Sequence, residues 1–137
     1  ANFSMYNPHY IEGEREWLRR RENGTKTNVA ATLQYTTPKW EPQFVSSSLI
    51  PLHDENFPYR IRDNTCLRWE MCRAGYKWKL VEDLFMFHRG IKRFESSAKL
   101  ESWKIQHINM PKYRRALSLF ETRLDGEYKS TRDSCPV

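Results

Sequence analysis

Three carboxylates and one histidine are the side chains whose types and spacing first suggest chemistry. Asp54 and Glu55 are adjacent in a proline-bounded segment, and Glu70 comes sixteen residues after Asp54. His88 directly follows an apolar run, where a buried strand would end. Carboxylates and an imidazole that meet at the strand ends of an α/β sheet can form a metal site or a sugar-nucleotide site. The sequence therefore predicts such a site, provided that the surrounding elements bring these residues together.

Strand patterns are predicted on both sides of the acidic segment. Residues 28–35 and residues 76–81 alternate apolar and polar side chains, which is typical of half-buried strands. Residues 84–87 form a continuous apolar run of the kind found in central strands. Two shorter strands are predicted at 44–45 and 49–50, divided by a run of serines. Together with the helices, these patterns predict an α/β fold.

Helices are predicted at 63–74, at 98–108 and before the C-terminal tail. In the first of these, Asp63 is expected to cap the N-terminus, and Gly75 is expected to end the helix in a left-handed conformation. The last helix is expected to follow an interruption at Pro111. Its apolar face carries Tyr113, Ala116, Leu117, Phe120 and Leu124.

Glu70 falls on the apolar face of the helix predicted over 63–74. Leu67, Met71 and Ala74 define that face at positions i, i+4 and i+7. A carboxylate on this face must find a partner, because burying its charge without one costs free energy. Two interpretations stay open: a structural contact with neighbouring backbone or an arginine, or a role in binding a substrate.

Length and composition limit the class of protein. The 137 residues are enough for one domain at most, and an apolar content of 39% with 14% aromatic residues indicates a folded chain. The net charge of +6 suits nucleic acid, anionic membranes or phosphate-bearing small molecules. No nucleic-acid-binding motif accompanies that charge, so no nucleic-acid partner is expected. No run of about 18 apolar residues is present, so membrane attachment would need a segment that this sequence lacks.

Two N-glycosylation sequons and an odd number of cysteines bear on the cellular compartment. The sequons begin at Asn2 and Asn23 and tilt the prediction toward the secretory pathway. Cys66 and Cys72 lie roughly 9 Å apart along the predicted helix, too far to pair directly. Cys135 is the better partner for either of them, and free buried thiols are an equal alternative.

A series of short motifs, taken in order, resembles glycosyltransferase family 49. The series runs Trp-Glu-Pro at 40–42, Pro-x-x-Asp-Glu-x-Phe at 51–57, Ala-Gly-Tyr at 74–76 and Phe-x-Phe-His-x-Gly at 85–90. Glu70 stands in its place between the second and third motifs, and the likeness covers about residues 39–135. The family includes the beta-1,4-glucuronyltransferases and the glucuronyltransferase domain of the LARGE enzymes.

The resemblance implies a partial GT-A-like fold, a sheet that binds nucleotide sugars. It also implies transfer of glucuronate, or a related sugar, from a UDP-sugar to a glycan acceptor, with inversion and with Mn²⁺ or another divalent cation. In the family the metal is held by an Asp-x-Asp motif and a histidine, and the matching histidine here is His88. The chain contains no Asp-x-Asp. The resemblance therefore implies the C-terminal half of a transferase domain, or a truncated relative that is inactive alone.

The resemblance also implies roles for several other residues. Asp54 and Glu55 match the segment where related enzymes place acceptor-side acids, so each is a candidate base for the acceptor hydroxyl, with Asp54 slightly favoured. The alternative for both is an ordinary loop or capping acid. Trp40 could stack on a sugar ring or pack in the core. Arg89 and Lys92 could bind the diphosphate or be ordinary surface cations. The expected substrate-binding residues are therefore Trp40, Glu70, Arg89 and Lys92.

The chain is accordingly divided into residues 1–38, a variable segment, and residues 39–137, the C-terminal half of the same glycosyltransferase-like domain. The expected location is the Golgi lumen or another part of the secretory pathway, and the expected partners are a UDP-sugar and a glycan. A non-catalytic protein that binds a glycan or assists a transferase is the alternative. Such a protein would bind sugar without needing a metal.

Overall fold

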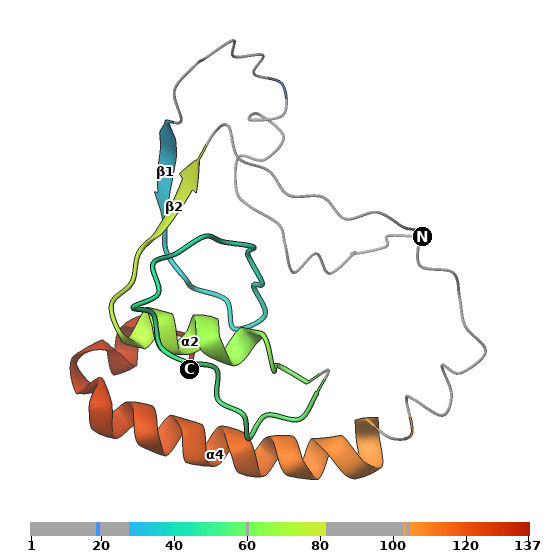
Figure 1. Cartoon of the computed structure of the whole chain (residues 1–137). Helices are drawn as coiled ribbons and strands as arrows, with labels where there is room; N and C mark the ends of the chain where they lie inside the picture. The colour runs from blue at the N-terminus through green and yellow to red at the C-terminus, as the bar shows by residue number, and fades with distance from the viewer. Residues whose placement is uncertain (1–18, 20–27, 60, 82–102, 104) are drawn as a thin grey trace.

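The computed structural model describes residues 19, 28–59, 61–81, 103 and 105–137. Its regular elements, in chain order, are β1 (Val29–Leu33), α2 (Thr65–Arg73), β2 (Trp78–Val81), a π-helical turn (Ile105–Asn109), α4 (Met110–Glu127) and a 3₁₀ helix (Lys129–Ser134). Figure 1 shows α2 lying alongside the longer α4, with the β1–β2 sheet extending away from the end of α2. The described part of the chain is therefore mixed α/β.

Strands β1 and β2 form a two-stranded antiparallel sheet. Leu33 pairs with Trp78 and Thr32 with Lys79, and the register shifts between residues 29 and 31. The two alternating patterns therefore predicted strands correctly, at 28–35 and at 76–81. The apolar run at 84–87, predicted as a central strand, lies outside the described residues. The described helices and this small sheet together make a mixed α/β structure, and the larger GT-A-like sheet stays a prediction.

The prediction of short strands at 44–45 and 49–50 is wrong. Residues 44–50 form loops and turns in the structure. Val45 and Leu49 are 77% and 83% exposed, so neither side chain contributes the burial that stabilises a strand. Phe44 instead turns inward and packs edge-on against Trp78 at a centroid distance of 5.0 Å.

Helix α2 forms where its apolar periodicity predicted it, but its N-terminus differs from the prediction. The N-cap position is Asn64, and no side chain there hydrogen-bonds the first turn. Asp63 is therefore not the cap. Its carbonyl oxygen accepts a hydrogen bond from the Cys66 thiol at 3.1 Å, and it lies 3.2 Å from His53 Nδ1. Gly75 ends the helix with φ +83°, as predicted, because glycine adopts this conformation without a Cβ clash.

The main core lies between α2 and α4. Phe57, Trp69 and Phe120 meet there, and the Phe57 and Phe120 rings are 5.3 Å apart in an edge-on arrangement. Ala116, Phe120 and Leu124 are buried, which confirms the predicted apolar face of α4. Pro111 does not interrupt a helix as predicted. It lies in the first turn of α4, where its missing N–H would be unpaired in any case.

The C-terminal segment is fastened to the end of α2. Cys72 and Cys135 form a disulfide, and Cys66 is a buried free thiol. The Arg73 guanidinium donates to the Val137 carbonyl oxygen at 3.1 Å and to Asp125 at 2.8 Å. Of the cysteine alternatives left open by the sequence, the structure therefore selects one disulfide, between Cys72 and Cys135.

Candidate functional site

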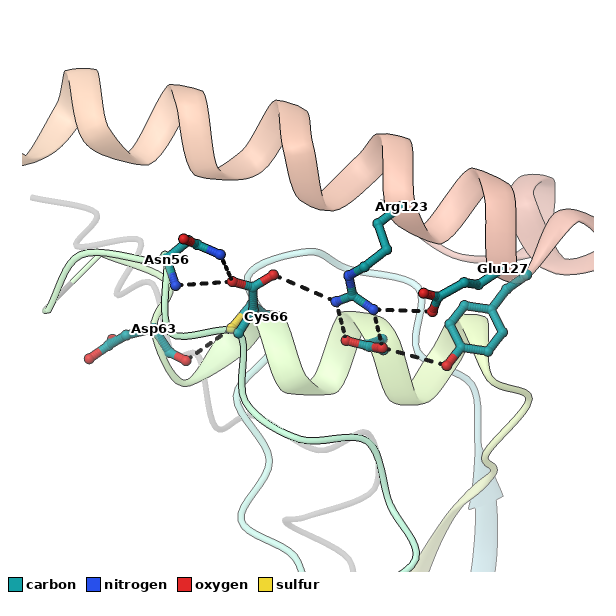
Figure 2. Close-up of polar contacts among 8 residues, drawn as sticks. Asn56, Asp63, Cys66, Arg123 and Glu127 are labelled. Carbon is teal, nitrogen blue, oxygen red and sulfur yellow. Dashed lines mark hydrogen bonds and ion pairs between the residues drawn. The ribbon is translucent and has the colours of Figure 1, made fainter.

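Arg123 on α4 lies at the centre of the acidic side chains that the sequence singled out. Its two terminal nitrogens donate to the two carboxylate oxygens of Glu70 on α2, at 2.7 and 2.8 Å. The same guanidinium faces Asp54 Oδ2 at 3.6 Å and Glu127 Oε2 at 3.2 Å. Figure 2 shows Arg123 reaching from α4 toward α2 with Glu127 beside it. One cation therefore links three carboxylates from three separate segments.

Glu70 is buried, and its charge is satisfied by the two parallel hydrogen bonds from the Arg123 guanidinium, the Arg123–Glu70 fork. The residue is 4% exposed, and the Tyr128 hydroxyl adds a third, longer contact to Oε1 at 3.5 Å. A bidentate guanidinium–carboxylate pair is among the stronger ionic hydrogen bonds in proteins. The sequence left two interpretations of Glu70 open, and one of them was a structural contact with an arginine. The structure shows such a contact. The substrate-binding role of Glu70 stays a prediction.

The charges around Arg123 act in one direction on its pKa. The hydrogen bonds that Arg123 donates to Glu70 raise the Arg123 pKa, and burial opposes this effect in part. The nearby charges of Glu127 and Asp54 also raise it. The Tyr128 pKa is raised as well, first by burial and then by the Glu70 charge. Arg123 is therefore a permanent cation, and it cannot serve as an acid or base in this site.

Asp54 is held at the start of a turn. Its Oδ1 accepts the Asn56 backbone N–H at 3.0 Å and the Asn56 side-chain amide at 2.8 Å, while Oδ2 faces Arg123. Three residues after Asp54, Phe57 is buried against Trp69. Glu55 lies between these two anchors and is exposed. The structure therefore brings Asp54 and Glu70 together around Arg123, whereas Glu55 faces solvent.

Cys66 lies directly beneath this turn, on the first turn of α2. Burial raises the pKa of its thiol to about 11, and the nearby Asp54 carboxylate adds to the increase by repulsion. Because a neutral thiol is a poor nucleophile, Cys66 is not a candidate nucleophile at neutral pH.

We expect Cys66 to resist alkylation in the folded protein. With a pKa of about 11, a thiol at about pH 8 is ionised at roughly the 0.1% level. Iodoacetamide at that pH should label Cys66 slowly in buffer and quickly in urea, with the site identified by peptide mass spectrometry. Native labelling as fast as that of the unfolded chain would contradict this burial.

Trp40, predicted to bind substrate or to pack in the core, lies in an aromatic cluster with Tyr35 and Trp78. Its ring is 5.4 Å from the Tyr35 ring and 5.8 Å from the Trp78 ring. The indole N–H groups of Trp40 and Trp78 are buried, and neither has a hydrogen-bond partner among the described residues. Packing is therefore what the described contacts of Trp40 show, and a sugar-stacking role stays a prediction.

Several predicted residues lie outside the described residues. They are the proposed metal ligand His88, the proposed diphosphate-binding residues Arg89 and Lys92, and the sequon residues Asn2 and Asn23. Their roles stay predictions, and so does any contact between His88 and the turn that contains Asp54 and Glu55, the acidic turn.

The described residues do not fit a divalent cation. Within the described ranges, no group of three or more His, Cys, Asp and Glu side chains could hold a metal ion. The carboxylates of Asp54 and Glu70 both face Arg123, which supplies the positive charge between them. A manganese site with three protein ligands would therefore need at least one ligand from outside the described residues.

Sequence reasoning missed the residue that organises this cluster. Arg123 sits 53 residues after Glu70, and its position beside the apolar face of α4 was the available signal. A cation next to one apolar helical face and a carboxylate on another can meet when the two faces pack. Nothing in the spacing indicated which of the many arginines would do so.

Within the described helices, none is long and apolar enough to cross a membrane.

The comparisons with known proteins agree with the motif series. The family model described as "Glycosyl-transferase for dystroglycan" matches residues 4–129. The chain is also 31% identical over 64 residues to "Beta-1,4-glucuronyltransferase 1" of Danio rerio, a match that covers 47% of this chain and 15% of that protein. No solved structure matches the chain. Because the family model covers most of the sequence, including the segment before residue 39 where no motif was found, this chain belongs to glycosyltransferase family 49.

Proposed function

We propose that the protein transfers glucuronate, or a related sugar, from a UDP-sugar to a glycan acceptor with inversion at the anomeric carbon. The observation that carries this proposal is the family match over residues 4–129. The likeness to a zebrafish protein named as a glucuronyltransferase supports the choice of donor sugar. A GT-A-like sheet completed by further strands is part of the same proposal.

The reaction needs one base, and the acidic turn supplies two candidates. An acceptor hydroxyl attacks the anomeric carbon while the bond from that carbon to the diphosphate oxygen breaks, so UDP leaves with the bonding electrons. A carboxylate that accepts the hydroxyl proton makes the attacking oxygen more nucleophilic. Asp54 and Glu55 are the candidates for this role, because the turn that contains them is fixed to α2 and α4.

The remaining predicted residues complete the proposal. Trp40 and Glu70 would contribute to substrate binding, and Arg89 and Lys92 would contact the diphosphate. Dependence on manganese, with His88 as a ligand, follows from the resemblance alone. The Cys72–Cys135 disulfide supports a location in the secretory pathway, including the Golgi lumen, because such bonds persist in oxidising compartments.

A transfer assay tests this proposal. The full-length protein carrying this sequence is incubated with manganese, a panel of glycoside acceptors and either UDP-glucuronate, UDP-glucose or UDP-N-acetylglucosamine. We expect mass spectrometry to detect an acceptor that has gained one glucuronyl unit. Nuclear magnetic resonance of the product should show the anomeric configuration opposite to that of the donor.

Two controls make the outcome decisive. His88→Ala and an excess of EDTA should each abolish transfer, whereas Arg115→Met, a change at an exposed position of α4, should leave it intact. Binding of a glycan without transfer and without any effect of metal would favour the non-catalytic alternative. Retention of the donor configuration would overturn the inverting mechanism.

A further inference from the structure

We propose that Glu55, rather than Asp54, is the carboxylate that faces the acceptor, and that Arg123 and Asp54 position it. This inference rests on the proposed function, because it divides roles between the two candidate bases of the same site. It has a structural half, the fixing of the turn by Arg123, and a chemical half, the identity of the base. The two halves have separate tests.

Asp54 is poorly suited to accept a proton from a substrate. One carboxylate oxygen already accepts two hydrogen bonds from Asn56, and the other lies 3.6 Å from the Arg123 guanidinium. The side chain is 12% exposed, so little of it can reach an acceptor in solution. A general base must come within hydrogen-bond reach of the proton that it removes. The contacts of Asp54 are those of a residue that shapes a turn.

Glu55 has the opposite environment. It is exposed, and among the described residues no hydrogen bond or ion pair engages its carboxylate. Its backbone, in contrast, is fixed on both sides. Asp54 precedes it with the contacts just given, and Phe57 follows it in the core, 6.0 Å from the Tyr113 ring. A free carboxylate on a fixed backbone is the arrangement that a general base requires.

Arg123 supplies the fixed point for the turn. The fork to Glu70 holds the guanidinium plane in one orientation, because both of its terminal nitrogens are engaged by one carboxylate. From that orientation the same group faces Asp54 Oδ2. The ring of Phe120, 5.3 Å below the guanidinium carbon, limits its movement further. Loss of Arg123 should therefore loosen the turn that carries Glu55.

Hydrogen exchange tests the structural half and needs no activity. Arg123→Met keeps an unbranched apolar side chain and removes the guanidinium and its charge, and Arg115→Met is the matched change at an exposed position of the same helix. We expect exchange of the Asn56 backbone amide, which donates to Asp54, to rise on the order of tenfold in Arg123→Met and to stay unchanged in Arg115→Met. Arg123→Lys, which keeps the charge without the fork, should give an intermediate rate. Equal exchange in all four proteins would overturn the positioning role.

Kinetics test the chemical half with two isosteric variants in the same transfer assay. Glu55→Gln should lower kcat on the order of 10²–10⁴-fold with little change in KM for the acceptor. Asp54→Asn keeps the acceptor oxygen for Asn56, so it should retain kcat within roughly tenfold. Arg123→Met should raise the acceptor KM, and Arg123→Lys should restore part of it.

Three outcomes would count against the chemical half. A kcat for Asp54→Asn as low as that of Glu55→Gln would make Asp54 the base, and an unaffected Glu55→Gln would remove Glu55 from the reaction. A wild-type protein that transfers no sugar would overturn the proposed function and the role of Glu55 with it. In that case the exchange experiment still judges Arg123 on its own.

Discussion

Removal of the Cys72–Cys135 disulfide should lower the free energy of unfolding by about 4 kcal/mol. The bond joins residues that are 63 positions apart, so it restricts a large loop in the unfolded chain. It also connects the end of α2 to the C-terminal segment, where Arg73 contacts Asp125 and Val137. A domain of this size has a total stability of roughly 5–15 kcal/mol, so the loss would be a large fraction of it.

Urea unfolding of the Cys72→Ala/Cys135→Ala double variant measures this effect. Cys66→Ala is the control, because it removes a buried thiol and leaves the disulfide intact. We expect the double variant to unfold at a much lower urea concentration than the control. A difference from wild type of less than about 1 kcal/mol would mean that the C-terminal segment is held mainly by the contacts of Arg73.

Replacement of Arg123 by methionine should lower the free energy of unfolding by about 2–3 kcal/mol. It leaves Glu70, 4% exposed, with one long contact from Tyr128 in place of a bidentate partner. The cost is set below that of a fully buried pair because the Arg123 side chain is 36% exposed and water can partly replace it.

A double-mutant cycle separates the ion pair from its surroundings. Glu70→Met/Arg123→Met removes both charges and leaves no buried carboxylate without a partner, so it should be more stable than the sum of the single changes predicts. We expect a coupling free energy of about 1.5–3 kcal/mol from chemical denaturation. Simple additivity of the two single changes would show that Glu70 and Arg123 do not act as a pair.

The sequence predicted the elements whose patterns are local. The apolar stripe of α4 and the alternation of residues 76–81 each reflect burial of one face, and both elements formed where expected. Gly75 was predictable because the end of a helix often requires a positive φ. Asp63 is not the cap because α2 begins one residue later, with Asn64 at the N-cap position, and the Asp63 carbonyl oxygen faces His53 of the preceding loop, a contact that no local pattern reveals.

The candidate site was predictable to a smaller extent. The position of Glu70 on an apolar face required a partner, but the choice of Arg123 depends on how α2 packs against α4. The distinction between Asp54 and Glu55 was likewise beyond the sequence. The two are adjacent and chemically alike, and they differ in what surrounds them: Asp54 faces Arg123 and Asn56, whereas Glu55 faces solvent. The role of His88, outside the described residues, stays a prediction from the family resemblance.

Sugar transfer is tested most directly by the mass of a glycoside acceptor after incubation with the protein, UDP-glucuronate and manganese. We expect the acceptor to gain one glucuronyl unit and UDP to be released in equal amount. An acceptor of unchanged mass, under conditions where the protein is folded and its disulfide is formed, would contradict the proposal that the protein transfers glucuronate.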